Sequence, residues 1–262
     1  MSLVGEERKK HIIELIEAHD KVTVDHLADT FDVSRETIRR YLNELEAQGK
    51  LKKVYGGAIK VSYGRIEPAY TERETKHIAE KTMIGKKAAE LIQPNEFIFL
   101  DEGSTTLQIV PHLLSIKELT IITNSFSIIN LLMEYEKQHE FTGKIIFLGG
   151  EVNSKHQRVC GTFSEKMLEN FYVDKAFISI DGITIDHGIT SLDSAKATLS
   201  SRIIAMAKDC CVVADHSKVG VRDYYRIADL KDIDYIICDK QPPASWQSYL
   251  KSNQTSWIIA AK

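Results

Sequence analysis

The sequence contains no apolar run that approaches the roughly 18 residues of a membrane-spanning helix. Its first residues, a short polar stretch followed by charged side chains, carry no secretory signal. The four cysteines have no metal-ligand spacing, and the nine histidines are scattered. These absences argue against a membrane protein and against a metal site or cofactor. They indicate a cytoplasmic protein whose thiols are buried and reduced.

Charge, by contrast, is unevenly distributed along the chain. The formal net charge of −3 comes from residues 61–262, because residues 1–60 carry 11 basic and 11 acidic residues. Within residues 1–60, the stretch 35–60 holds seven basic residues against three acidic ones. A basic patch attached to a mildly acidic body is typical of a protein that binds nucleic acid by one end, although a charged run can also be a solvated surface.

Apolar spacing predicts three short helices before residue 50. The first lies within residues 7–18, and Thr23 can cap the second. Ser34 can cap the third, whose Ile38, Leu42 and Leu45 lie on one face. Residues 51–59 then read as a strand, a glycine turn and a strand. This order predicts a helix-turn-helix followed by a β-wing.

The third helix carries the side chains that a recognition helix needs. Such helices present their N-terminal residues to base edges in the major groove, where arginine can bind guanine through two hydrogen bonds. The predicted DNA contacts are Ser34, Arg35, Thr37, Arg39, Arg40, Lys52, Lys53 and Tyr55. The alternative is a helical module that binds protein through an incidental basic face. The combination of capped basic helix and wing favours DNA.

Residues 33–49 and the wing at 54–58 resemble the DNA-binding domain of the DeoR family of bacterial transcription regulators. The residues that match the family pattern are Ser34, Thr37, Ile38, Arg39, Arg40, Leu42, Gly56, Gly57 and Ala58. Tyr41 departs from it, since an acid usually stands at that position. The resemblance implies a winged helix-turn-helix that binds operator DNA.

From residue 82 onward, strand-like apolar runs alternate with helical patterns. The runs lie at 97–100, 119–122, 144–148, 175–180, 210–214, 234–239 and 257–260. Their alternation with helices predicts an α/β domain with a mainly parallel sheet, covered by helices on both faces. We expect the DNA-binding domain at 1–60, a linker at 61–74 and the α/β domain at 75–262.

Small polar residues follow several of the predicted strands. In a parallel sheet the carboxyl ends of strands share one edge, so these residues can converge on a ligand. Glycine gives room, hydroxyls and amides favour an anion, and carboxylates accept from sugar hydroxyls. The predicted effector-binding residues are Asp101, Gly103, Ser104, Thr105, Thr106, Asn124, Ser125, Gly149, Gly150, Asp181, Gly182 and Lys218. The alternative is that such residues serve only turn geometry and helix capping.

Residues 75–260 resemble the sensor domain of the same family, which is similar to the fold of ribose-phosphate isomerases and coenzyme A transferases. The match includes Asp101-x-Gly103-Ser104-Thr105-Thr106, Thr123-Asn124-Ser125, Asp181-Gly182-Ile183 and Asp215-x-Ser217-Lys218. Lys196-Ala197 and Ser200 replace a Glu-Ala pair and a later lysine that are frequent in the family. A ligand contact from that helix is therefore expected to be lost or changed in sign.

The resemblance implies a transcriptional repressor of a sugar or polyol operon. A phosphorylated sugar or polyol would release it from operator DNA, and a homodimer or homotetramer would place paired heads on the DNA. One alternative is a sugar-phosphate isomerase with an accessory DNA-binding head, and another is a repressor with a degenerate sensor that responds to protein partners. We expect no catalysis, because no acid–base pair stands out and an enzyme would leave the DNA-binding head unexplained.

Overall fold

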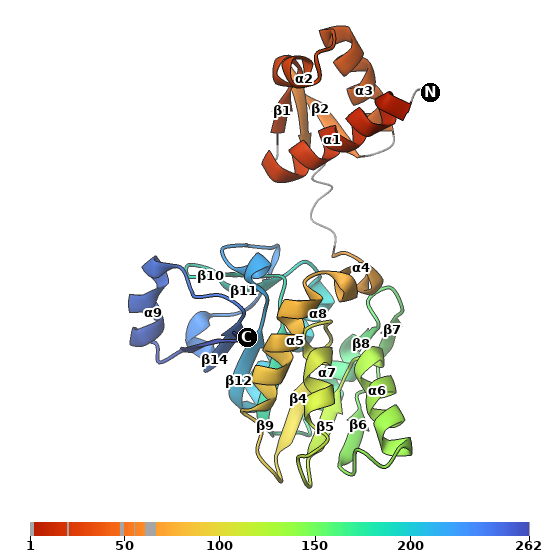
Figure 1. Ribbon diagram of the computed structural model, residues 1–262. Helices are drawn as coiled ribbons and strands as arrows, with labels where there is room; N and C mark the ends of the chain where they lie inside the picture. Colours follow the sequence, from red (N-terminus) through yellow and green to blue (C-terminus); the bar gives the residue numbers. More distant parts are fainter. Residues whose placement is uncertain (1–2, 20, 48–49, 55, 61–66, 262) are drawn as a thin grey trace. The chain divides into compact units, whose positions relative to one another are not determined.

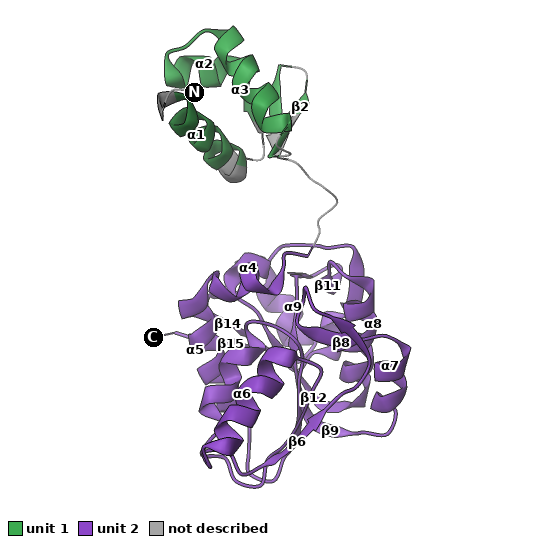
Figure 2. Ribbon diagram, turned by 90° about the vertical axis from the view of Figure 1, so that its right-hand side faces the viewer, with its two compact units in different colours: residues 1–65 green, residues 66–262 purple. Residues whose placement is uncertain are grey.

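The computed structural model describes residues 3–19, 21–47, 50–54, 56–60 and 67–261 (Figure 1). The chain divides into two compact units, Met1–Arg65 and Ile66–Lys262 (Figure 2). We call the first unit the head and the second the body. Residues 67–74, predicted as part of the linker, fall within the body, where Glu67 is buried and Tyr70–Thr75 forms helix α4. This charged stretch reads as a linker because its buried ion-pair partners lie far away in the sequence.

The described residues of the head form three helices and a small antiparallel sheet. The helices are α1 (Leu3–His19), α2 (Val24–Phe31) and α3 (Arg35–Ala47). The strands are β1 (Lys21–Thr23), β2 (Leu51–Val54) and β3 (Gly57–Lys60), in the order β1-β3-β2. The predicted helices and wing are confirmed. Strand β1 was not predicted, because three residues are too few to show a period.

The second and third helices of the head begin where the sequence predicts, whereas α1 begins at Leu3, before the predicted range of residues 7–18. Thr23 accepts a hydrogen bond from the backbone N–H of His26, and Ser34 Oγ accepts one from Thr37 N at 3.2 Å. Asp32, between α2 and α3, adopts a left-handed conformation with φ of 48°, which permits the tight turn. The predicted apolar face of α3 is buried in the head's core.

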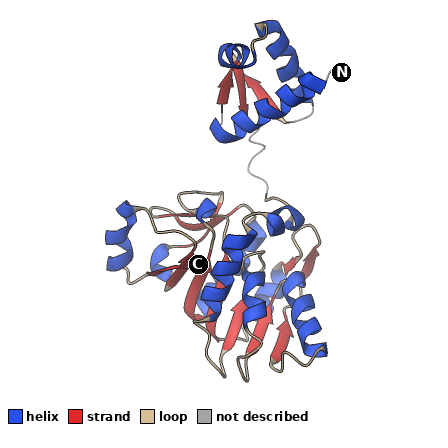
Figure 3. Ribbon diagram, viewed as in Figure 1, coloured by secondary structure: helices blue, strands red, loops and turns tan. Residues whose placement is uncertain are grey.

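In the described part of the body, seven parallel strands form the central sheet (Figure 3). They are β4 (Phe97–Leu100), β5 (Thr120–Thr123), β6 (Lys144–Phe147), β9 (Val173–Ser179), β12 (Ala207–Val213), β14 (Tyr235–Cys238) and β15 (Ser256–Ile259). Their order is β15-β14-β12-β9-β4-β5-β6. Each coincides with a predicted strand, so the parallel α/β fold is confirmed.

The sheet separates two apolar cores, because neighbouring strand residues point to opposite faces. Ile98 and Leu100 pack on the side of α5 (Ile78–Ala89) and α6 (Phe126–Lys137). Phe99 packs on the other side, against the core that includes residues of α7 (Thr162–Leu168), α8 (Ser194–Met206) and α9 (Gln247–Ser252). The helical pattern after residue 106 forms a 3₁₀ helix, Thr106–His112, which contains Pro111. A proline lacks the N–H that an α-helix interior requires.

Further short strands were not predicted, because their polar sequences show no clear alternation. A hairpin joins β7 (Glu151–Asn153) to β8 (Arg158–Cys160). A second small sheet contains β10 (Gly182–Thr184), β11 (Gly188–Ser191) and β13 (Tyr225–Ala228).

The four cysteines are buried and free, as predicted. The described helices include none with the length and apolar character needed to cross a membrane. Nor do the described residues hold a group of His, Cys, Asp and Glu that could bind a metal ion.

Candidate functional site

A cavity of about 290 Å³ lies at the carboxyl edge of the parallel sheet. Turns after three neighbouring strands line it: Gly103 to Thr105 after β4, Ser179 to Asp181 at the end of β9, and Asp215, Ser217 and Lys218 after β12. The segment before β4 completes the wall with Pro68, Arg73, Lys76, His77 and Lys81. Ligands of open α/β sheets bind at this edge, so the cavity is the candidate effector site.

The cavity brings together five of the predicted effector-binding residues: Gly103, Ser104, Thr105, Asp181 and Lys218. The others do not line it: Asp101, Thr106, Asn124, Ser125, Gly149, Gly150 and Gly182. Sheet order explains much of this division. Strands β5 and β6 lie beyond β4 on one side of the sheet, so the polar residues at their ends are further along the edge.

The residues outside the cavity have structural contacts instead. Thr106 Oγ1 donates to the carbonyl oxygens of Asp101 and Gly103, which shapes the turn after β4. Asn124 Nδ2 donates to the Val159 carbonyl, and Ser125 caps α6.

Two of the glycines outside the cavity, Gly150 and Gly182, pack tightly against neighbouring groups, whereas a Cβ added to Gly149 would meet nothing within 4 Å. A Cβ added to Gly150 would lie 1.9 Å from Ser164 Oγ, while Ser164 Oγ itself donates to the Gly149 carbonyl. A Cβ on Gly182 would lie 2.4 Å from the Val221 carbonyl oxygen.

Asp101 lies beneath the cavity and does not face it. Its carboxylate accepts from Ser179 N and Ser200 Oγ, both at 3.3 Å. Burial, and then the adjacent Glu102, raise its pKa to about 7. Because Asp101 is buried away from the cavity, it is not placed to exchange a proton with a ligand there.

Lys81 is the most deeply buried cation of the cavity wall. Its Nζ donates to Ser104 Oγ at 2.9 Å and to the Arg73 carbonyl oxygen. Burial lowers the pKa of Lys81 to about 8; Asp215 opposes this shift, while Lys218, Arg73 and Lys76 add to it. Lys81 is therefore largely charged at neutral pH, among other cations.

The two carboxylates on the cavity wall are engaged by neighbouring groups. Asp215 accepts from Ser217 N at 3.0 Å. Asp181 accepts from Ser191 Oγ at 2.9 Å and from Leu192 N at 3.1 Å. Burial raises the pKa of Asp181, but Lys196 and these hydrogen bonds outweigh it and hold the pKa below its usual value. Four lysine and arginine side chains therefore face two ionised carboxylates among the described lining residues, which favours an anionic ligand.

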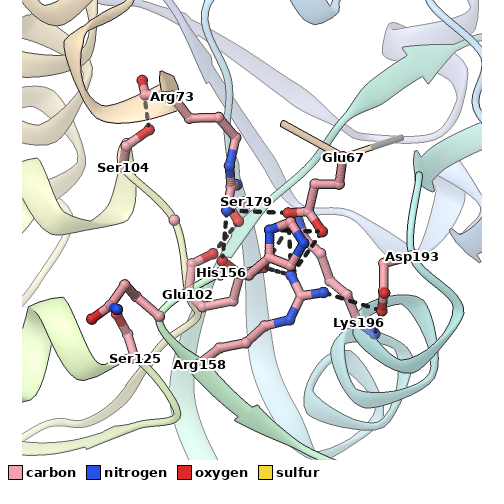
Figure 4. Close-up of polar contacts among 12 residues, drawn as sticks. Glu67, Arg73, Glu102, Ser104, Ser125, His156, Arg158, Ser179, Asp193 and Lys196 are labelled. Carbon is pink, nitrogen blue, oxygen red and sulfur yellow. Dashed lines mark hydrogen bonds and ion pairs between the residues drawn. The ribbon is translucent and has the colours of Figure 1, made fainter. Parts of the chain in front are cut away.

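A buried network of charges adjoins the cavity (Figure 4). Arg158 is fully buried, with its Nη1 3.0 Å from Glu67 Oε2 and 2.7 Å from Glu102 Oε1. Its Nη2 lies 3.1 Å from Asp193 Oδ1. Arg73 joins the network from the cavity wall, with Nη2 3.1 Å from Glu67. This network was not predicted from the sequence, because its members lie on separate elements and form no local motif.

The departures at Lys196 and Ser200 lie beneath the cavity. Lys196 Nζ is 3.5 Å from both Glu102 and Asp181, and Ser200 donates to Asp101. Neither residue lines the cavity. In this structure both therefore stabilise buried carboxylates.

The head has its own hollow, of about 450 Å³, between α3 and the wing. Arg35, Arg39 and Lys53 line it, so three of the predicted DNA contacts converge there. Arg40 is exposed outside this hollow, with its guanidinium carbon 5.6 Å from the centre of the Tyr41 ring.

The remaining predicted DNA contacts divide into two groups. Ser34 and Thr37 lie at the start of α3, where their hydroxyl oxygens are 3.0 Å apart. The Lys52 side chain and Tyr55 lie outside what the structure describes.

Comparison with known families matches both units of the chain. Residues 8–63 match the DeoR-like helix-turn-helix domain, and residues 76–240 match the DeoR C terminal sensor domain. The chain belongs to the DeoR family. It is a DNA-binding transcriptional regulator with a sensor domain, and the isomerase hypothesis is not favoured.

Relatives in this family cover nearly the whole chain. The HTH-type transcriptional repressor GlcR of Bacillus subtilis (strain 168) is 32% identical over 254 residues, which are 97% of this chain and 96% of the relative. A regulator named FruR from the same strain, described as uncharacterized, is 34% identical over 90% of this chain and 91% of its own length. Among solved structures, ribose 5-phosphate isomerase A from Neisseria gonorrhoeae is 17% identical over 54% of this chain and 53% of that chain, with a TM-score of 0.40.

Proposed function

We propose that this DeoR-family regulator is a repressor that binds operator DNA through α3 and the wing. A small phosphorylated sugar or polyol in the cavity of the body would release it from that DNA. The observation that carries the effector class is the cationic cavity, in which Arg73, Lys76, Lys81 and Lys218 outnumber the carboxylates. The family's sensor domain and a relative named as a repressor support the regulatory role.

The cavity matches both halves of such an effector. Its cations suit a phosphate, which accepts several charge-assisted hydrogen bonds. Asp181 and Asp215, held ionised, can accept from the hydroxyls of a sugar or polyol. A volume of about 290 Å³ is at the small end of ligand pockets, which suits a monosaccharide phosphate better than a dinucleotide.

A thermal-shift screen tests the effector class. The panel contains phosphorylated glucose, fructose, ribose and glycerol, each beside its unphosphorylated parent. We expect one or more phosphorylated members to raise the melting temperature and to release bound DNA in a gel shift. A stronger response to unphosphorylated parents would contradict the proposal.

Lys218→Ala is expected to weaken effector binding on the order of 10- to 100-fold, the usual loss for a hydrogen bond to a charged group. The lysine lines the cavity and lies outside the head, so DNA affinity without effector is expected to stay unchanged. Titration of DNA release in a gel shift measures both quantities. Lys251→Ala, at an exposed site in α9, is the matched control. If the Lys218 variant releases DNA at the same effector concentration as wild type, Lys218 does not contribute to effector binding.

Effector binding is expected to weaken about tenfold between about pH 7 and about pH 9. Lys81, with a pKa of about 8 in the free protein, loses its proton as pH rises through that value, and the neutral amine no longer attracts an anion. A phosphate monoester stays doubly charged throughout, since its second pKa is about 6. Calorimetric titration at each pH measures the effect, and Lys81→Met should bind more weakly with a flat profile. An equal slope in this variant would assign the titration to another group.

We further propose a homodimer or homotetramer, because one head has few base contacts and paired half-sites multiply affinity. Sedimentation equilibrium would measure the state, and a monomer at working concentration would contradict it.

A further inference from the structure

The wall of the cavity includes the chain that arrives from the head. The division between the units falls after Arg65, and Pro68 and Arg73 line the cavity only a few residues later. Lys76 and His77, at the end of this stretch, line it too. A ligand in the cavity therefore touches the segment that leads to the DNA-binding unit. We call residues 67–77 the entry segment.

Buried ion pairs hold the start of the entry segment. Glu67 is only 3% exposed, and its carboxylate lies 3.0 Å from Arg158 Nη1 and 3.1 Å from Arg73 Nη2 (Figure 4). A backbone hydrogen bond of 3.1 Å from Tyr70 N to the Lys155 carbonyl adds a second attachment. The position of the segment thus depends on how well the Glu67 carboxylate is paired.

Arg73 is shared between the cavity and these pairs. It lines the cavity, yet its Nη2 lies 3.1 Å from Glu67 and 3.5 Å from Glu102. An anion in the cavity would compete with these carboxylates for the positive charge of the same guanidinium, whose buried Nε and Nη2 donate no hydrogen bond to either of them. The pairing of Arg73 with Glu67 and Glu102 is therefore one of charge, and movement of the guanidinium toward an anion in the cavity would weaken it.

Glu67 is the carboxylate that such competition would affect most. Glu102 lies near Lys196 at 3.5 Å and near Arg158 at 2.7 Å, so it keeps two cations without Arg73. Glu67 would retain Arg158, which it shares with Glu102 and Asp193. Burial already raises the pKa of Glu67, and His156 at 3.6 Å gives little help, since burial and nearby arginines lower its pKa to about 4 and leave it neutral.

We propose that Arg73 is a positioning residue that couples the cavity to the entry segment: an anion in the cavity draws its guanidinium from Glu67, and the start of the body is then held less tightly. The coupling rests on the proposed function, because it requires an anionic effector. Reciprocity follows from linkage: whatever weakens the Arg73–Glu67 pair must favour the effector-bound state.

Glu67→Gln tests the coupling without touching the cavity lining. The amide keeps the shape of the side chain and removes the charge that holds Arg73. With the panel compound that gives wild type its largest thermal shift as probe, the variant is expected to release DNA at a concentration lower by about fivefold or more. If Glu67 has only a structural role, the variant should have a lower melting temperature, while the probe concentration that releases half of the DNA (the release midpoint) should stay unchanged.

Glu96→Gln is the matched control. Glu96 forms a partly buried ion pair with Lys175, and it precedes β4, at the end of the sheet opposite to the cavity. Its loss should cost stability without shifting the release midpoint. A release midpoint of Glu67→Gln equal to or above that of wild type would overturn the coupling.

Hydrogen exchange on the wild-type protein gives a second test that does not depend on how the variant folds. Inorganic phosphate, compared with chloride at equal ionic strength, is expected to speed exchange of the Tyr70 amide. Unchanged or slower exchange, with the melting temperature raised by phosphate, would overturn the coupling. If no phosphorylated compound binds wild type, the proposed function fails. If one binds and releases DNA while Glu67→Gln responds normally, only the coupling fails.

Discussion

Replacing Arg158 by alanine is expected to destabilise the body by about 3–5 kcal/mol, the usual cost of removing one partner from a buried ion pair. Arg158 is fully buried, and Glu67, Glu102 and Asp193 surround its guanidinium. Without it, the buried carboxylates repel one another and lose hydrogen-bond donors that water cannot replace. The free energy of unfolding should therefore fall far more than for loss of a surface arginine.

Tryptophan fluorescence during urea unfolding measures this change in the body alone. The chain has two tryptophans, Trp246 and Trp257, and both belong to the body. Arg202→Ala is the matched control: it removes an arginine with a 48% exposed side chain that pairs with Glu165 and Glu169. Surface pairs contribute about 0–1 kcal/mol, so its unfolding midpoint should barely move.

The cost of losing Arg158 should also depend on pH. In the variant, burial without the arginine should raise the pKa values of Glu67 and Glu102 above those of the unfolded chain. A carboxyl whose pKa is higher in the folded than in the unfolded state stabilises the folded protein at pH values below its unfolded-state pKa. This stabilisation is lost as the pH rises through its folded-state pKa. The difference in the free energy of unfolding between wild type and the Arg158 variant should thus be larger at about pH 8 than at about pH 5. If Arg158→Ala lowers the free energy of unfolding less than Arg202→Ala does, the buried network contributes little to the stability of the body.

The strands of the body were predictable because both faces of the sheet are buried. Residues such as Ile98, Phe99 and Leu100 form an apolar run in which every position meets a core. The order of the strands was not predictable, since pairing across helical crossovers depends on contacts between distant segments. That order decides which polar strand ends share the cavity, so the sequence identified the edge of the sheet but not the full wall.

Charge explains the other difference between expectation and structure. A polar stretch such as 67–74 suggests a linker when each side chain is considered alone. Arg73 is instead paired with Glu102 in the turn after β4, and Glu67 with Arg158 of β8. The two partners in each of these pairs are more than 25 residues apart in the sequence, so no local sequence pattern predicts the pairs. The entry segment, which these pairs hold, contributes four residues to the cavity wall.

The head was the most predictable part, because its signals are local. Ser34 caps α3 by accepting a hydrogen bond from the backbone N–H three residues further on, and the apolar side chains of α3 recur at helical spacing. The exposed basic residues then follow by exclusion from the buried face. Arg35, Arg39 and Lys53 converge because the wing folds back beside α3, as its glycine turn allows.

Arg39→Ala is expected to reduce affinity for operator DNA by about 1–3 kcal/mol, or roughly 5- to 150-fold, with less discrimination at the base pair it reads. Arg39 is exposed on α3 and lines the hollow beside the wing, and its contact with Glu36 Oε2 is long, at 3.4 Å. Such an exposed pair costs little to break, so the guanidinium is available to a base edge. Its side chain packs in no core, so the head should stay folded.

Binding sites selected from random DNA by the wild-type protein supply the operator for this test. A gel shift at fixed salt then compares the Arg39 variant with wild type on selected and on scrambled sequences. Loss confined to the selected sequences identifies a base contact, whereas equal loss on both identifies a phosphate contact. Arg202→Ala, in the body, should bind as wild type does. Unchanged operator affinity in the Arg39 variant would exclude this arginine from the DNA interface and leave Arg35 and Lys53 as the contacts from the hollow.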